Sequence, residues 1–193
     1  MGNLLRSTTE TAMHIVAEYI REVKCPVIID ATCGRGNDTV ALAKAAAGEF
    51  VLFAFDIQAE AIESTSKLLR ENGFDTSMKN LHIIRDSHLN VDKYTESIDA
   101  AVFNLGYLPG GDKSVTTCGS ISVSAVMKAV DMLNPNGIVA VTMYDGHTEG
   151  RAEKEMILEK LECLDSRIYH VAYLKLVNQH RNPPETVFVT RKV

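Results

Sequence analysis

Polar side chains follow four short apolar runs of this sequence, and their types and spacing could hold a ligand. The runs at residues 27–29, 50–55, 81–84 and 98–103 are typical of buried strands. Because ligands of open α/β sheets bind beyond the carboxyl ends of the strands, we expect the four following segments to share one site. The candidate residues are Asp30, Gly34, Gly36, Asn37, Asp38, Asp56, Gln58, Asp86, Ser87, His88, Asn104 and Tyr107.

The first segment, D-A-T-C-G-R-G-N-D, begins at Asp30 and is typical of a strand-to-helix turn that binds a ligand. Gly34 and Gly36 let the backbone approach the ligand closely, and the following helix offers free N–H groups. Asp30 and Asp38 would repel a pyrophosphate and attract an ammonium group, Asn37 adds a further polar group to the turn, and the spacing is not G-x-G-x-x-G. This turn predicts a cationic, adenosine-containing ligand without phosphates, such as S-adenosylmethionine. Glycines that only form the turn are the alternative.

The second and third segments suit the nucleoside part of the same ligand. Asp56, two residues before Gln58, can accept two hydrogen bonds from ribose hydroxyls. Asp86 or Ser87 could contact the adenine amino group, and His88 could pack over the ring. Solvated turn residues are the alternative for both segments, because Asp and Ser are common in turns. The order of the three segments along the chain favours one bound cofactor.

The fourth segment places an amide close to an aromatic ring. The apolar run stops at Asn104, and Tyr107 and Pro109 follow. We expect the Asn104 side chain, or a nearby backbone carbonyl, to accept an N–H bond from the substrate while Tyr107 stacks on it. An amine needs mainly alignment and desolvation for an in-line methyl transfer, but a protonated alkylamine must first lose a proton. His88, Asp86 or water could receive that proton, and the sequence leaves the three alternatives open.

The elements that must position these segments alternate between helix and strand. This alternation predicts one domain, residues 1–193, with a Rossmann-like α/β fold. We expect a seven-stranded, mostly parallel sheet with helices on both faces. The last two strands lack an intervening helix, so the C-terminal strand should be antiparallel. Beyond the four strands already given, the sequence predicts strands at 138–143, 167–176 and 186–190, and helices at 8–23, 39–47, 59–72, 120–133 and 149–164.

Composition and charge limit the classes of protein and partner. With 193 residues, 46% of them hydrophobic, and a net charge of −5, the chain is typical of a one-domain protein without an extensive basic surface. No apolar run suits a membrane span, and no segment resembles a secretion signal. Catalytic use of Cys33 would need a base that the sequence does not reveal. Reduced thiols in the cytoplasm and no metal site are predicted from four scattered cysteines, Cys25, Cys33, Cys118 and Cys163.

A local basic patch for RNA remains compatible with this charge. The polar loop at 178–184 and the segment at 144–147 could line a substrate-contacting rim, and apolar side chains of the N-terminal helix could serve a homodimer. Solvated surface positions are the alternative for every basic candidate. Candidate phosphate contacts are Arg6, Arg35, Lys113, His180 and Arg181.

Together, the four segments resemble the motifs of class I S-adenosylmethionine-dependent methyltransferases over nearly all of the chain. Residues 30–36 resemble the first motif, with Thr32 in place of its usual first glycine. Asp56 matches the ribose-binding acid, and residues 86–88 match the adenine-side motif. N-L-G-Y at 104–107 resembles the D/N-P-P-Y motif of amino-group methyltransferases, with Leu and Gly in place of the two prolines.

The combination of D-A-T-C-G-R-G-N-D-T with N-L-G-Y-L-P-G-G-D-K resembles a narrower bacterial family, the rRNA methylases. That family includes tRNA methyltransferases that act on the 5-aminomethyl group of 2-thiouridine at the wobble position. The resemblance implies S-adenosylmethionine as methyl donor, the tRNA anticodon loop as partner and 5-methylaminomethyl-2-thiouridine as product. An rRNA, a protein or a small amine as acceptor stays open, as does a non-catalytic cofactor-binding module. A nicotinamide dehydrogenase is disfavoured because the phosphate fingerprint is absent.

Overall fold

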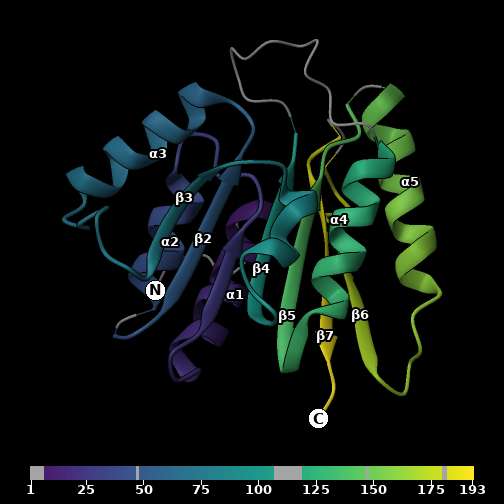
Figure 1. Cartoon of the computed structure of the whole chain (residues 1–193). Helices are drawn as coiled ribbons and strands as arrows, with labels where there is room; N and C mark the ends of the chain where they lie inside the picture. The colour runs from purple at the N-terminus through teal and green to yellow at the C-terminus, as the bar shows by residue number, and fades with distance from the viewer. Residues whose placement is uncertain (1–6, 47, 107–118, 147, 180–181) are drawn as a thin grey trace.

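The computed structural model describes residues 7–46, 48–106, 119–146, 148–179 and 182–193 (Figure 1). Most of the predicted strand-end segments fall within these ranges. The sequence-based candidates that lie outside the described residues are Arg6, Tyr107, Pro109, Lys113, Cys118, His147, His180 and Arg181.

Within the described residues, seven strands form one sheet in the order β3-β2-β1-β4-β5-β7-β6 (Figure 1). Strands β1 to β5 pair in parallel, whereas β7 pairs antiparallel with both β5 and β6. The predicted sheet is confirmed. Its strand order reverses direction between β1 and β4, the kind of place where α/β sheets bind ligands. The strands are β1 (Val27–Asp30), β2 (Val51–Asp56), β3 (Leu81–Arg85), β4 (Ile98–Leu105), β5 (Leu133–Met143), β6 (Tyr169–Leu174) and β7 (Glu185–Arg191).

Helices cover both faces of the sheet, as the sequence predicts (Figure 1). Ile28 and Leu52 enter the core on one face, and Ile29 and Phe53 enter the core on the other. Neighbouring residues of a strand thus enter opposite cores, which is why the strands read as unbroken apolar runs. The first core packs against α1 (Thr8–Glu22), α2 (Asn37–Ala45) and α3 (Ala59–Glu71), and the second against η1 (His88–Lys93), α4 (Gly119–Asp131) and α5 (Thr148–Glu162).

The structure corrects the sequence-based boundaries near the rim of the sheet. Strand β4 includes Asn104 and Leu105, which stay in parallel register with β5, whereas the sequence predicts an end at residue 103. The sequence also misses η1, a 3₁₀ helix that Ser87 caps. Strand β5 begins at Leu133, before the predicted turn at 134–137, because a register shift in the β4–β5 ladder accommodates that turn within the strand.

Candidate active site

The turn between β1 and α2 is built around a buried aspartate. Asp30 is 1% exposed, and its carboxylate accepts hydrogen bonds from Thr39 Oγ1 at 2.5 Å and from the Thr32 backbone N–H at 3.2 Å. Burial, followed by the negative charge of Asp38, raises the pKa of Asp30 to about 7. Asp56 adds a further negative charge, so the turn is suited to a cation.

Two glycines bring the backbone of this turn against the neighbouring loop. Gly36 has φ +86°, and a Cβ atom there would lie 2.8 Å from Thr65 Cα in α3. The Gly34 N–H donates to Asp56 Oδ2 at 3.1 Å, and the Gln58 N–H donates to Asp56 Oδ1 at 3.0 Å. Asp56 therefore ties the loops after β1 and β2 together. Since a carboxylate has about four lone-pair sites, it keeps capacity for hydroxyl donors.

The loop after β3 is held by its own side chains. Asp86 accepts hydrogen bonds from the Ser87 N–H at 2.7 Å, from Asn90 Nδ2 at 2.8 Å and from Tyr94 Oη at 3.0 Å. The hydrogen bond from Asn90, followed by those from Ser87 and Tyr94, lowers the pKa of Asp86. Ser87 Oγ caps η1 by accepting from the Leu89 N–H. Asp86 is therefore a stable anion that orders this loop.

His88 is a neutral side chain with one unsatisfied nitrogen. Its Nδ1 donates to the Ala31 carbonyl at 3.1 Å, and its ring meets Phe103 edge-on. Burial lowers the pKa of His88, so the imidazole is uncharged at neutral pH. Its Nε2 is buried and has no partner within the described part of the chain. A ligand with an N–H or O–H group could satisfy this nitrogen.

Asn104 is held at two points and keeps its amide oxygen unsatisfied. Its backbone N–H donates to Thr32 Oγ1 at 2.8 Å, and its Nδ2 donates to Asp38 Oδ2 at 3.3 Å. Burial raises the pKa of Asp38, and the hydrogen bond from Asn104 partly opposes that shift. Asn104 Oδ1 is buried, with no donor among the described residues. This oxygen is therefore available to an N–H group of a substrate.

Thr32, which replaces the usual first glycine of the first motif, contacts Asn104 in the structure. Its hydroxyl links the β1 turn to the end of β4, across 72 positions of sequence. A glycine at position 32 would offer no acceptor to the Asn104 N–H. A threonine in place of the usual glycine at position 32 was the signal for this contact, although the sequence alone does not reveal that its partner is Asn104.

The start of α1 lies beside Asn104, a contact that the sequence does not predict. A cavity of about 10 Å³, room for roughly one water molecule, is lined by Thr9, Met13, Asp38 and Asn104 among others. Helix α1 begins here with a capping box formed by Ser7 and Glu10.

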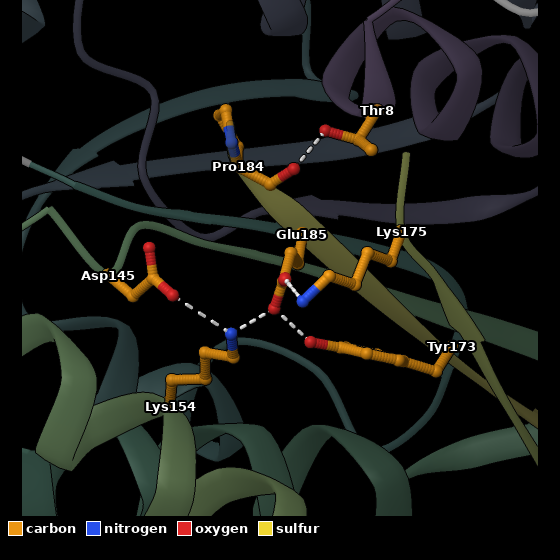
Figure 2. A network of polar contacts seen from close by, with 7 residues as sticks. All are labelled: Thr8, Asp145, Lys154, Tyr173, Lys175, Pro184 and Glu185. Carbon is orange, nitrogen blue, oxygen red and sulfur yellow. Dashed lines mark hydrogen bonds and ion pairs between the residues drawn. The ribbon is translucent and has the colours of Figure 1, made fainter. Parts of the chain in front are cut away.

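The first turn of α1 is also tied to the start of β7. Thr8 Oγ1 donates to the Pro184 carbonyl at 2.5 Å (Figure 2). This bond joins residues 176 positions apart in the sequence. The N-terminal helix and the C-terminal strand therefore meet at one place on the rim.

The side chains of the remaining sequence-based candidates within the described residues make none of the contacts given above. Asn37 is the exposed first residue of α2, and the Gln58 side chain makes no capping bond at the start of α3. Cys33 is buried, and burial raises the pKa of its thiol to about 12, so it offers no thiolate at neutral pH. Across the described ranges, no group of His, Cys, Asp and Glu could hold a metal ion. No helix in that part of the chain is long and apolar enough to cross a membrane.

Comparison with known sequences identifies a family. The family described as "Putative rRNA methylase" matches residues 52–190 of this chain. A chloroplastic tRNA (mnm(5)s(2)U34)-methyltransferase from Arabidopsis thaliana is 36% identical over 160 residues, which cover 79% of this chain. The match spans 58% of the length of that plant protein.

Comparison with solved structures extends the likeness over the whole fold. A protein described as "putative rRNA-methylase" from Clostridium thermocellum is 34% identical with a TM-score of 0.88, covering 97% of this chain and 98% of its own. A protein described as "a putative methyltransferase" from Streptococcus mutans, crystallised in complex with SAH, is 31% identical with a TM-score of 0.83, covering 97% of this chain and 99% of its own. The chain therefore belongs to the rRNA methylase family and has the class I methyltransferase fold.

Proposed function

We propose that this protein transfers the methyl group of S-adenosylmethionine to the primary amine of 5-aminomethyl-2-thiouridine at the tRNA wobble position. The observation that carries the proposal is the buried, unsatisfied Oδ1 of Asn104 beside an acidic glycine turn. The product would be 5-methylaminomethyl-2-thiouridine. The substrate named for the plant relative supports this acceptor.

The loops after β1, β2 and β3 fit the cofactor. The acidic turn of Asp30 and Asp38 suits the ammonium and sulfonium charges, and it would not suit a phosphate. Asp56 is positioned for ribose hydroxyls, and the unsatisfied Nε2 of His88 offers an acceptor near Phe103. S-adenosylmethionine supplies an electrophilic methyl group on a sulfonium centre. The bound SAH of the Streptococcus mutans relative supports this choice of cofactor.

Asn104 would orient the acceptor amine. Its Nδ2 donates to Asp38, whereas its Oδ1 has no donor among the described residues and would accept one amine N–H. That bond directs the nitrogen lone pair at the methyl group. Alignment is the main contribution of the enzyme when the nucleophile is already reactive. Thr32 fixes the backbone of Asn104, and Asp38 holds the amide nitrogen of its side chain, so the amide has little freedom to turn away.

Water is the proton acceptor that the geometry favours. A primary alkylamine is mostly protonated at neutral pH and must lose a proton before attack. Burial lowers the pKa of His88, which makes it a weak base, and the carboxylate of Asp86 is occupied within its own loop. We therefore infer that the amine enters the site already neutral, having lost its proton to solvent.

A wobble uridine suits a protein of this charge. The net charge of −5 disfavours broad binding along an RNA helix. Bases of an exposed anticodon loop can be splayed out and stacked on aromatic side chains. Binding a single extruded nucleotide therefore requires only a small site at the rim of the sheet and little basic surface.

Nucleoside mass spectrometry of RNA from a strain lacking the protein tests the proposal. We expect the methylated wobble nucleoside to disappear from tRNA and the aminomethyl precursor to accumulate. Unchanged wobble nucleosides would refute the tRNA substrate. The rRNA of the same strain should be analysed in parallel, since a methyl group lost there would identify the acceptor implied by the family's description.

A further inference from the structure

An ion network centred on the buried Glu185 lies among α5, β6 and β7 (Figure 2). Glu185, 4% exposed, accepts hydrogen bonds from Lys154 and Tyr173 and pairs with Lys175 at 2.7 Å. Although burial raises the pKa of Glu185, its three donors outweigh that effect and lower the pKa to about 2. Lys154 also pairs with Asp145 at 3.1 Å. The ammonium of Lys154 thus lies between two carboxylates from different segments.

The network ends one residue away from a ring on the acceptor side. Tyr144, the residue before Asp145, lies just beyond β5, and Gly106 lies just beyond β4. The two strands stay in parallel register up to their last residues, so Tyr144 and Gly106 are neighbours. A Cβ atom on Gly106 would lie 3.0 Å from Tyr144 Cδ2 and 3.1 Å from Cε2. Glycine at position 106 therefore makes room for this ring, two residues from Asn104.

We propose that the network is a positioning device for the acceptor: Lys154 holds Asp145 and so keeps the ring of Tyr144 against Gly106, where it forms a wall for the target nucleobase. This inference rests on the proposed function, because the wall needs a flat heteroaromatic acceptor. Aromatic side chains are common stacking platforms for single bases. Lys154 is the positioning residue, and Tyr144 is the residue that touches the substrate.

Burial at the centre of the network supports a positioning role. The side chains of Glu185, Lys154 and Asp145 are 5%, 14% and 20% exposed, so solvent screens their attraction only partly. Lys175 and Tyr173, at the edge of the network, are 54% and 46% exposed. Fully exposed ion pairs fix a loop weakly. The pairing of Asp145 with the largely buried Lys154 therefore restrains the second residue of the loop between β5 and α5.

A fluorescent reporter tests the wall without requiring catalysis. The chain contains no tryptophan, so Tyr144→Trp introduces a single emitting indole. We expect an RNA hairpin with an anticodon loop and a wobble uridine to quench that emission as the base stacks on the ring. In the otherwise native chain, Tyr144→Ala should weaken hairpin binding by about fivefold or more, the range of base–aromatic stacking. The affinity for S-adenosylmethionine should stay unchanged.

Asp145→Ala tests the role of the network, because it leaves the Lys154–Glu185 pair intact. In the Tyr144→Trp background we expect weaker quenching and roughly threefold to tenfold weaker hairpin binding, because the ring is displaced but still present and part of the stacking is kept. Asp92→Ala is the matched control. Asp92 also pairs with a lysine, Lys128 at 2.8 Å, and its removal changes the net charge equally. Hairpin binding by the control should stay within about twofold, as expected for an exposed pair.

The outcomes separate this inference from the proposed function. If the native protein methylates tRNA but saturating hairpin leaves the Tyr144→Trp emission unchanged, the wall is refuted and the function stands. Equal effects of Asp145→Ala and Asp92→Ala on hairpin binding would refute the positioning role. If Tyr144→Trp does not fold, unaltered hairpin binding by Tyr144→Ala refutes the wall instead. A native protein that neither binds nor methylates such RNA overturns the proposed function and this inference together.

Discussion

The two sides of the rim are held together in different ways. On the proposed cofactor side, several carboxylate contacts are local, such as Asp56 with the Gln58 N–H and Asp86 with the Ser87 N–H, although Asp56 also accepts from the Gly34 N–H across 22 positions. On the acceptor side the contacts are distant in sequence. The Asn104 N–H reaches Thr32 across 72 positions, and Lys154 reaches Glu185 on the antiparallel strand β7.

The side held by distant contacts depends more strongly on the whole fold. Loops that order themselves through contacts two residues apart need only the end of a strand to form. An amide held by a distant hydroxyl needs the correct register of β1 and β4. We therefore expect substitutions on the cofactor side to change binding of S-adenosylmethionine, and those on the acceptor side to change turnover or RNA binding.

Replacement of the acceptor-side amide should have the largest effect. Asn104→Ala removes the only proposed contact to the amine, and we expect kcat to fall roughly a hundredfold or more, as with other single polar contacts to a reacting centre. Calorimetry should show S-adenosylmethionine binding within about twofold of native, since the cofactor-side contacts remain. Equal losses in kcat and cofactor affinity would remove the distinction between the two sides.

The buried aspartate on the cofactor side should show the opposite pattern. Asp30→Asn removes a negative charge from the turn, and we expect cofactor affinity to fall about tenfold or more, the effect of one charged contact. The same substitution should raise thermal stability at pH 8, because the native carboxylate is ionised there without a cation to stabilise it. A variant that loses stability at pH 8 would contradict this reading of Asp30.

The pH dependence of unfolding tests independently whether ionisation of Asp30 destabilises the folded protein. The folded-state pKa of Asp30 is about 7, above its ordinary value of 3.8. The folded protein therefore holds a proton that the unfolded chain has lost between these values, so this contribution to stability is full below pH 3.8 and is lost as the pH rises through 7. Urea unfolding should show a decline over this window that Asp30→Asn removes. An identical decline in the variant would assign it to another group.

Gly36 and Gly73 form a matched pair that tests whether α3 leaves room for a Cβ atom at position 36. Gly36 and Gly73 have φ of +86° and +84°, but a Cβ atom meets Thr65 only at Gly36, and nothing lies within 4 Å at Gly73. Gly73→Ala should lower the free energy of unfolding by about 1 kcal/mol, the cost of a left-handed alanine. Gly36→Ala should lower it by about 2 to 4 kcal/mol, because crowding is added. Equal losses in urea unfolding would show that α3 moves away freely.

The smallest effect is expected at the link between the two sides. Thr32→Val keeps the shape but removes the acceptor for the Asn104 N–H, and kcat should fall about threefold to tenfold, the worth of one neutral hydrogen bond. Thr32→Ser keeps the hydroxyl and should restore most of the rate. If the serine variant is as slow as the valine variant, the methyl group of Thr32 matters and the hydrogen bond does not.

The sequence predicts the sheet and the local loops because both depend on short-range patterns. Apolar runs that end in Asp30, Asp56 and Asp86 reveal strand ends, and the absence of a helix before the last strand reveals its antiparallel direction. These features follow from burial on both faces of the sheet and from turn chemistry.

The acceptor side could not be predicted in the same way. The contact of Thr32 with Asn104 depends on two strands lying side by side, and the pairing of Lys154 with Glu185 depends on the register of β7. The glycine of N-L-G-Y looked like a lost proline in the sequence, and only its neighbour Tyr144 gives it a physical reason. Contacts between distant segments have no signature in one sequence.

The central claim is tested most directly by single-turnover methyl transfer in vitro. Purified protein, S-adenosylmethionine and tRNA carrying 5-aminomethyl-2-thiouridine would be combined, and the wobble nucleoside analysed by mass spectrometry. The account predicts that this nucleoside gains one methyl group on its exocyclic nitrogen, and that Asn104→Ala does so far more slowly. An unmodified wobble nucleoside after many expected turnover times, with S-adenosylmethionine shown to be bound, would contradict it.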